Sequence, residues 1–326
     1  MSLHVAFRSP NWLGDSVMAT VVPAALRRAP QVSRVTVLTP KGLGDVFLRS
    51  PDVDDTVEIA PGREVDALRA GGYDLVVLGP TSFGSAWRTL RAGVKAAGFA
   101  TSGRGWLLRR RLPGAEYRRG RHQVENYRAL AALAGESAPE DEPAVHLDDE
   151  WRRAAEARWP ADGRRRVALQ PGATFGPAKR WSGERFGSVA RSLAESGHQV
   201  AVLGGPKDAE PVAETMAAAG SAALDLSGRF RVGELAAILE SADLLVTNDT
   251  GPMHLAAAVG TRCLALFGST SPEWTAPRGT GHRVVTNPVP CAPCFQRTCR
   301  IGTPCLEGIA AERVARGVGD MLEELR

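Results

Sequence analysis

The stretch TNDTGPMHLAAAVG, residues 247–260, decides how the fold is interpreted. Upstream, ADLLVTN (242–248) is a short apolar run of strand type, and the residues after it, MHLAAAVG (253–260), are the small helix-forming residues of a buried helix. Asp249 or Thr250 can cap this helix, and the proline that follows suits its first turn. Free backbone N–H groups should therefore face whatever lies beyond the strand, which is a place for phosphate.

The same junction carries a carboxylate, Asp249, where anions are expected to bind. The two kinds of group suit two parts of one ligand. The amides after Thr250 would face phosphates, while Asp249 would accept hydrogen bonds from sugar hydroxyls. The stretch therefore predicts a site for a phosphorylated sugar.

Short apolar runs alternate with helical stretches on both sides of a polar, proline-containing segment, AGESAPEDEPAVHLDDE (134–150). This alternation predicts two α/β, Rossmann-like domains with parallel sheets, at residues 1–150 and 151–326. The strands expected in the first are 3–8, 34–40, 55–60, 74–79 and 95–100. The strands expected in the second are 166–171, 199–205, 223–228, 243–248, 261–268 and 282–287.

Composition fits a globular protein with two cores, because the 326 residues are 44% hydrophobic and 23% charged. No apolar run approaches the ~18 residues of a membrane-spanning helix. The N-terminal sequence MSLHVAFRSPNWLGD lacks the layout of a signal peptide. We therefore expect a cytoplasmic protein.

Positive charge is concentrated in one segment. Between Arg104 and Arg128 there are eight arginines and two glutamates, a balance of +6, so the rest of the chain carries 4 − 6 = −2. Such a patch can attract nucleic acid, a phospholipid surface or a phosphorylated ligand. A solvated arginine face is the alternative interpretation.

Ligands of open parallel sheets bind beyond the carboxyl ends of the strands. The loop SPNWLGDSVMAT (9–20) leaves the first strand and carries Asp15, either as a helix cap or as a catalytic carboxylate. It has no GxGxxG pattern, which disfavours a dinucleotide-binding dehydrogenase.

Two loops of the second half carry groups that suit a nucleotide. QPGATFGPAKRW (170–181) offers a hydroxyl and two cations that could hold a pyrophosphate, with a surface turn anchored by Trp181 as the alternative. Glu234 opens the helix ELAAILESA, where it could favour the helix dipole or accept bonds from ribose hydroxyls.

Six motifs together resemble the ADP-heptose:lipopolysaccharide heptosyltransferases, glycosyltransferase family 9, and most of all their type II members. They run in family order over nearly the whole chain: GDSVMAT (14–20), PGATFGPAKRW (171–181), VLGGPKD (202–208), TNDTGPMHLAAAVGT (247–261), LFGSTSPEWTAP (266–277) and CAPCFQRTC (291–299). The resemblance implies a GT-B fold, in which two Rossmann-like domains face a cleft. It also implies inverting transfer of heptose from ADP-L-glycero-β-D-manno-heptose to a Kdo-bearing lipid A core.

The resemblance assigns roles by motif. Asp15 matches the proposed general base, and Lys179 matches the cation that counters charge on the departing ADP. Glu234 matches the ribose-binding acid, and Asp249 would orient the heptose. The donor-binding positions as a group are Thr174, Lys179, Glu234, Asp249, Thr250, Gly251 and His254. A partly buried, hydrogen-bonded histidine is the alternative for His254.

One position departs from the type II pattern, because Thr174 stands where that pattern has glutamate, and it resembles the hydroxyl-bearing loop of type I. The arginine segment suits either type, since the acceptor carries phosphates and Kdo carboxylates at the inner-membrane surface. We therefore expect a peripheral membrane enzyme with no nucleic-acid partner. The candidate acceptor-binding residues are Arg109, Arg110, Arg111, Arg118, Arg119 and Arg121.

No metal is expected to be required for transfer. Asp52-Val53-Asp54 has the Asp-X-Asp pattern of metal-dependent transferases, but it precedes a strand and is interpreted as a turn. Cys291, Cys294, Cys299 and Cys305 could hold zinc or an iron–sulfur cluster, although free thiols are favoured because the spacing matches no standard site. Cys263 lies in an apolar strand and is expected in the core.

The sequence thus predicts a heptosyltransferase of type II. The alternatives are a transferase of the same fold for another nucleotide sugar, a GT-B-like sugar-nucleotide 2-epimerase, and a non-enzymatic thiol–metal module. A final helix is expected within 307–325, and GT-B tails often pack back on the amino-terminal domain.

Overall fold

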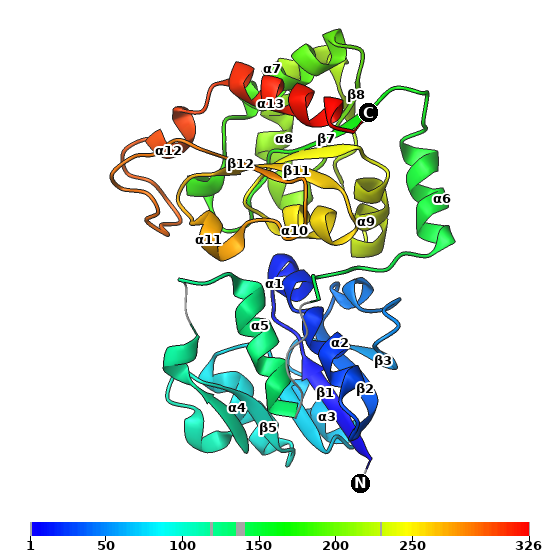
Figure 1. Cartoon of the computed structure of the whole chain (residues 1–326), viewed down its shortest axis with the longest axis vertical. Coiled ribbons are helices and arrows are strands. Elements are labelled where there is room, and N and C mark those ends of the chain that lie inside the picture. Colours follow the sequence, from blue (N-terminus) through cyan, green and yellow to red (C-terminus); the bar gives the residue numbers. More distant parts are fainter. Residues whose placement is uncertain (1, 118–119, 135–140, 229, 326) are drawn as a thin grey trace. The chain divides into compact units, whose positions relative to one another are not determined.

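A computed structural model of the chain describes residues 2–117, 120–134, 141–228 and 230–325. The chain forms two compact units, Met1–His146 and Leu147–Arg326 (Figure 1). The boundary between them lies in the polar segment 134–150 that was identified in the sequence.

The first unit is built on a six-stranded parallel sheet with the strand order β3-β2-β1-β4-β5-β6. Five strands confirm the sequence prediction, and β6 was not predicted. The strands are β1 (Leu3–Arg8), β2 (Val32–Pro40), β3 (Asp55–Ile59), β4 (Leu75–Leu78), β5 (Ala96–Ala100) and β6 (Arg110–Pro113). Asp52-Val53-Asp54 lies in the turn before β3, as expected.

Helices cover both faces of this sheet, since α4 and α5 each contact β4 and β5 while α4 packs with α3 and α5 packs with α1 and α2. The helices are α1 (Leu13–Met18), α2 (Val21–Arg28), α3 (Glu64–Ala70), α4 (Phe83–Arg91) and α5 (Gln123–Ala131). Burial on both faces explains why β4 is apolar at every position. One core cluster joins Val76 and Leu78 of β4 to Leu68 of α3 and Ala86 of α4.

The second unit repeats the plan with the strand order β12-β11-β10-β7-β8-β9, again all parallel. All six predicted strands are present. They are β7 (Arg166–Gln170), β8 (Gln199–Val202), β9 (Leu224–Asp225), β10 (Leu244–Asn248), β11 (Arg262–Phe267) and β12 (Arg283–Thr286).

Eight α-helices lie in the described part of the second unit. They are α6 (Asp149–Arg158), α7 (Gly183–Glu195), α8 (Ala209–Ala219), α9 (Val232–Glu240), α10 (Gly251–Ala258), α11 (Pro272–Thr275), α12 (Pro304–Glu307) and α13 (Ala311–Glu323). The final helix, α13, places Val314, Val318 and Met321 in the core of this unit, against α7, β10 and β11. A contact of its other face with the first unit stays a prediction. None of the described helices is long and apolar enough to span a membrane.

Candidate active site

Asp15 lies at the carboxyl edge of the first sheet, in the first turn of α1, which follows β1 directly. Its carboxylate does not cap this helix, because the N-cap position is Trp12 and no side chain there accepts a capping bond. Instead, the hydroxyl of Tyr127 on α5 donates a hydrogen bond to Asp15 Oδ1 over 2.9 Å. Helix capping, the alternative interpretation of Asp15, is therefore not what the structure shows.

Tyr127 keeps its proton in this environment. Its side chain is 3% exposed, and burial, followed by the negative charge of Asp15, raises the pKa of Tyr127 well above its ordinary value. The hydroxyl therefore remains a donor to Asp15 and fixes the orientation of the carboxylate.

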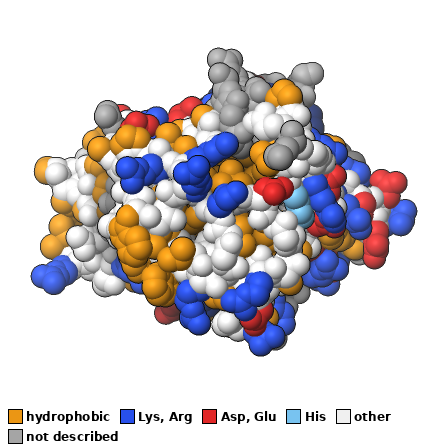
Figure 2. All heavy atoms as spheres, turned by 90° about the horizontal axis from the view of Figure 1, so that it is seen from below, with side chains coloured by type: hydrophobic (Ala, Val, Ile, Leu, Met, Phe, Trp, Pro, Cys, Tyr) orange, Lys and Arg blue, Asp and Glu red, His pale blue; other side chains and the backbone are white. Residues whose placement is uncertain are grey.

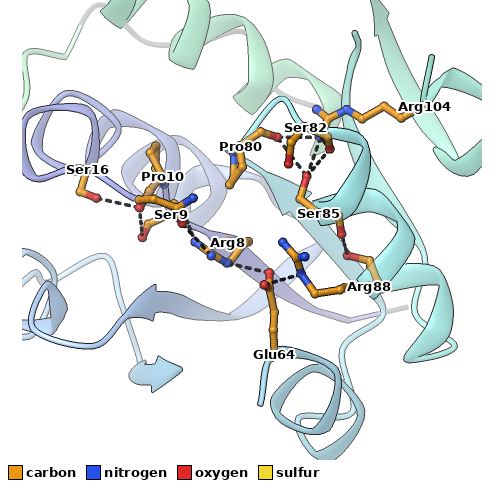
Figure 3. A network of polar contacts seen from close by, with 12 residues as sticks. Arg8, Ser9, Pro10, Ser16, Glu64, Pro80, Ser82, Ser85, Arg88 and Arg104 are labelled. Carbon is orange, nitrogen blue, oxygen red and sulfur yellow. Dashed lines mark hydrogen bonds and ion pairs between the residues drawn. The ribbon is translucent and has the colours of Figure 1, made fainter. Parts of the chain in front are cut away.

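An ion network holds three elements of the first unit together near the same edge (Figure 3). Arg8, the last residue of β1, donates from Nε to Glu64 Oε1 at 2.9 Å. Arg88 of α4 donates from Nε to the other carboxylate oxygen, Glu64 Oε2, at 2.7 Å. One acid at the start of α3 thus ties β1, α3 and α4 into a fixed arrangement, and both of its oxygens are used.

Arg104 belongs to the interior and not to the basic surface in which the sequence placed it. Its guanidinium is buried and donates to the carbonyl oxygens of Phe99 (2.8 Å), Pro80 (2.6 Å) and Ser82 (3.2 Å), and to Ser85 Oγ (2.9 Å). Burial lowers the pKa of Arg104 to about 10. Figure 3 shows how this side chain reaches the loop between β4 and α4.

The candidate acceptor-binding arginines differ in exposure. Arg110 and Arg111 are the first residues of the edge strand β6 and Arg109 precedes it; all three are exposed. Arg121 is half-buried and donates from Nε to Asn126 Oδ1 at 2.8 Å. Arg118 and Arg119 lie outside the described residues.

In the second unit, Asp249 follows β10 and is 4% exposed. Lys179 Nζ lies 2.5 Å from Asp249 Oδ2, and the hydroxyl of Thr270 donates to the same oxygen at 2.6 Å. Thr275 Oγ1 lies 3.4 Å from both carboxylate oxygens. The carboxylate at the anion site is thus neutralised by the cation that was expected to bind phosphate, so the junction does not repel an anion.

Asn248, the last residue of β10, explains why Lys179 reaches Asp249. Its buried amide accepts from Trp181 N at 3.1 Å and donates to Pro171 O at 2.8 Å. Both ends of the loop that carries Lys179 are therefore tied to β10. Sequence pattern gave no signal for this tie, because an asparagine at a strand end is common in any turn.

The rest of that loop separates into an exposed part and an anchored part. Thr174 is exposed, and Gly176 has a φ of 157°, with the carbonyl oxygen of Arg297 only 2.5 Å from where a Cβ would lie. Arg180 turns away from the site toward Glu210, at 3.3 Å. Trp181 is 1% exposed and anchors the chain, as its alternative interpretation predicted. Of the two cations of this loop, Lys179 is the one that reaches Asp249.

The turn after Asp249, which was predicted to face phosphate, has the predicted backbone form. Thr250 is the N-cap of α10 in an extended conformation, its side chain makes no capping bond, and the helix begins with Gly251. Backbone N–H groups therefore lie beside the Lys179–Asp249 pair. His254 lies one turn inside α10 and is buried.

Glu234 lies in the first turn of α9, where an acid favours the helix dipole, as its alternative interpretation predicted. Its Oε2 accepts a hydrogen bond from Arg231 N at 3.0 Å, which satisfies the first backbone donor of α9. Ribose binding by this half-buried acid stays a prediction.

The clustered cysteines are not arranged as a metal site in the part of the chain that the structure describes. All five cysteines are free thiols, and among the described residues no group of three or more metal-ligating side chains is arranged to hold an ion. Cys305 is buried, whereas Cys299 accepts from Thr303 N at 3.2 Å. Cys263 is fully buried in β11, as expected for a core residue.

Two parallel-sheet units with polar groups at the carboxyl edge of each sheet define a glycosyltransferase of the GT-B fold. A solved structure of the ADP-heptose lipopolysaccharide heptosyltransferase II of Escherichia coli matches with a TM-score of 0.84 and 26% identity, covering 99% of this chain and 100% of that chain. The model of glycosyltransferase family 9 (heptosyltransferase) matches residues 63–304, and the chain belongs to this family.

Relatives of more than one type are similar to the chain. Lipopolysaccharide heptosyltransferase 2 of Escherichia coli K12 is 27% identical over 301 residues, which are 85% of this chain and 86% of that protein. Lipopolysaccharide heptosyltransferase 1 of Pseudomonas aeruginosa is 31% identical over 240 residues, which are 71% of this chain and 64% of that protein.

Proposed function

We propose that this glycosyltransferase moves heptose from ADP-L-glycero-β-D-manno-heptose to the inner core of lipopolysaccharide, with inversion, as a type II enzyme. Membership in a family of heptosyltransferases supports the donor and acceptor class. The observation that carries the mechanism is the orientation of Asp15 by Tyr127 at the carboxyl edge of the first sheet.

Asp15 acts as the general base. As the acceptor hydroxyl oxygen attacks the anomeric carbon, its proton passes to the Asp15 carboxylate, and the bond from the anomeric carbon to the β-phosphate oxygen breaks. The electron pair of that bond leaves with ADP. Because the nucleophile attacks the face opposite the leaving group, one such displacement inverts the anomeric centre.

The second unit stabilises the leaving diphosphate. Lys179 Nζ, shared in the structure with Asp249, turns part of its charge toward the β-phosphate, and the N–H groups at the start of α10 add their dipoles. Thr174 and Thr250 contribute hydroxyl groups, Asp249 orients the heptose, and Glu234 accepts from the ribose. On this mechanism the positive charge at the leaving group comes from the protein.

The acceptor binds to the basic part of the first unit. Arginine forks suit the phosphates and Kdo carboxylates of a Kdo-lipid A core, and the arginines at 109–111, just before and at the start of the edge strand β6, are exposed. We assign the same role to Arg118, Arg119 and Arg121. Since the acceptor is a lipid, the enzyme works in the cytoplasm at the surface of the inner membrane.

The assay that tests the function follows ADP release and the mass of the glycolipid product. Purified protein should release ADP from ADP-heptose only when a heptosylated Kdo-lipid A acceptor is present, and the lipid should gain one heptose. Turnover of UDP-GlcNAc without an acceptor would instead establish an epimerase.

Donor choice is tested separately by thermal shift. A ligand at 100 times its dissociation constant stabilises the folded protein by about 2.7 kcal/mol. ADP and ADP-heptose should raise the melting temperature more than UDP and UDP-sugars at equal concentration. Equal shifts from the two nucleotide classes would remove the support for an ADP-sugar donor.

A further inference from the structure

Four large apolar side chains of the first unit are exposed together. Phe83 (41% exposed), Trp87 (43%) and Leu90 (46%) lie on α4, and Trp106 (68%) lies in the short 3₁₀ turn Gly105–Leu107 that packs on α4. The rings of Phe83 and Trp87 are stacked with centroids 6.3 Å apart, and the Trp106 ring lies 6.4 Å from that of Phe83. We call these four residues the aromatic face.

The helix α4 exposes its large apolar residues and buries its small ones, which is the opposite of what is expected for a helix on the surface of a soluble domain. Phe83, Trp87 and Leu90 recur at spacings of four and three, which is one helical stripe, and this stripe faces outward. The residues that face the sheet are small ones, Ser85 and Ala86 among them. Burial in the core of this unit therefore does not account for the large residues.

Two arginine contacts hold the backbone that carries the aromatic face. Arg104 lies two residues before Trp106 and donates hydrogen bonds to the carbonyl oxygens of Pro80 and Ser82, which lead into α4 (Figure 3). On the other side, Arg88 of α4 is tied through Glu64 to β1. The backbone that carries the aromatic side chains is thus tied to the rest of the first unit, which lowers the entropy lost on binding.

The surroundings of the aromatic face are cationic. Residues 75–115 contain seven arginines and lysines and no aspartate or glutamate. Arg91, Lys95, Arg109 and Arg111 of this segment are exposed, and Arg111 Nη1 bonds Gly105 O at 3.1 Å, beside Trp106. Figure 2 shows hydrophobic side chains gathered on the side where Figure 1 places α4, with Lys and Arg side chains next to them.

A surface with exposed tryptophan side chains and neighbouring lysines and arginines is suited to bind the headgroup region of an anionic bilayer. Indole rings prefer the membrane interface, and each basic residue near an anionic surface adds to the attraction. α4 follows β4, which pairs with β1, so the amino-terminal end of the aromatic face lies at the same sheet edge as Asp15. A bilayer on this face would bring lipid headgroups to that edge.

We infer that Phe83, Trp87, Leu90 and Trp106 form the surface by which this enzyme rests on an anionic phospholipid bilayer, with Arg91, Lys95, Arg109 and Arg111 contacting the headgroups. The inference rests on the proposed function in one respect, since a lipid acceptor is the reason for the enzyme to be at a bilayer. The binding itself is measurable without any substrate.

The test is sedimentation of the full chain with vesicles of phosphatidylglycerol and phosphatidylethanolamine, compared with vesicles of phosphatidylcholine alone. The wild type should bind the anionic vesicles, with affinity that falls as salt is raised. The double variant Trp87→Ala/Trp106→Ala should lose about ten-fold in partition coefficient. Ile301→Ala, which removes an equally exposed apolar side chain (69%) from the second unit, is the matched control and should bind as the wild type does.

An assay of heptose transfer with two acceptors distinguishes failure of this inference from failure of the proposed function. The double variant should lose activity toward an acceptor embedded in vesicles and keep activity toward the delipidated, water-soluble core oligosaccharide. Wild type that is inactive on both acceptors but binds vesicles would contradict the proposed function and leave the membrane surface standing. Should the double variant be unfolded by circular dichroism, Arg91→Glu/Lys95→Glu carries the test and should weaken binding to anionic vesicles.

Three results would overturn the inference. The first is wild-type protein that does not bind anionic vesicles, and the second is a folded double variant that binds them as tightly as the wild type. The third is a wild-type dimer that the double variant converts to a monomer without changing vesicle binding, because the aromatic face would then cover a second copy of the chain.

Discussion

The carboxyl edges of the two sheets each hold an important carboxylate, but they hold it differently. Asp15 in the first unit receives a hydrogen bond from the neutral hydroxyl of Tyr127. Asp249 in the second unit is buried against the ammonium of Lys179 and the hydroxyl of Thr270. The same edge of the same kind of sheet thus holds one acid through the hydroxyl of a tyrosine and the other through an ammonium group and a threonine hydroxyl.

This difference supports the proposed roles of the two acids. A carboxylate paired with a cation is poorly suited to accept a proton from a substrate, because protonation would break the ion pair. We therefore propose Asp15, and not Asp249, as the base, and we propose that Asp249 positions Lys179 for the leaving phosphate.

The largest effect is expected for Asp15→Asn. The amide keeps the shape and can still accept from Tyr127, but it cannot take a proton, so kcat should fall about 10³-fold. Steady-state kinetics with saturating ADP-heptose check this, with an unchanged melting temperature as the control for folding. A kcat within ten-fold of the wild type would show that another group is the base.

Lys179→Met should lower kcat about 10²-fold, because the leaving phosphate loses its cation. It also leaves Asp249 buried without its counter-ion, and the free energy of unfolding should fall by about 3 kcal/mol. The double variant Lys179→Met/Asp249→Asn should recover most of this stability in denaturant titrations and none of the activity. Equal stability of the single and double variants would mean that the ion pair is not formed in solution.

Tyr127→Phe should lower kcat about ten-fold, since removal of the hydroxyl frees the orientation of Asp15 at a cost of about 1 kcal/mol. Because burial and the charge of Asp15 raise the pKa of Tyr127, its proton stays in place at alkaline pH. The alkaline side of the pH–rate profile should therefore be the same in the variant and the wild type. If the wild type lost activity at alkaline pH and Tyr127→Phe did not, the tyrosine hydroxyl itself would have to ionise during the reaction.

The smallest effect is expected for Thr270→Val, which removes one of the bonds to Asp249 and keeps the shape of the side chain. The free energy of unfolding should fall by about 1 kcal/mol. The KM for ADP-heptose should rise a few-fold while kcat changes little, since Lys179 is less firmly placed. Ser269→Ala is the control, because Ser269 is the neighbouring buried residue and it is Thr270 that donates to Asp249.

Most of the fold could be predicted because strands buried on both faces are continuous apolar runs, as in β4 and β10. β6 was missed for the opposite reason. It is an edge strand whose first two residues are exposed arginines, and charged edge strands carry little strand signal. The segment was therefore interpreted only as a basic patch.

The candidate site was predicted in part. Asp15, Lys179 and Asp249 were found because they follow predicted strands, where ligands of parallel sheets bind. Their partners were missed, because Tyr127 is 112 residues from Asp15 and only the packing of α5 brings it near. The pairing of Lys179 with Asp249 also depends on Asn248, so the carboxylate that the sequence assigned to the sugar is already bound to protein groups. Its contact with heptose stays a prediction.

The division of labour between the two carboxyl edges is tested most directly by titration calorimetry of ADP-heptose into Asp15→Asn and Lys179→Met, each against the wild type. The dissociation constant should be unchanged for Asp15→Asn and raised about ten-fold or more for Lys179→Met, the loss expected for one charge-assisted bond. Weakening of donor binding by Asp15→Asn to the same degree would contradict the assignment of the base to one unit and of the donor grip to the other.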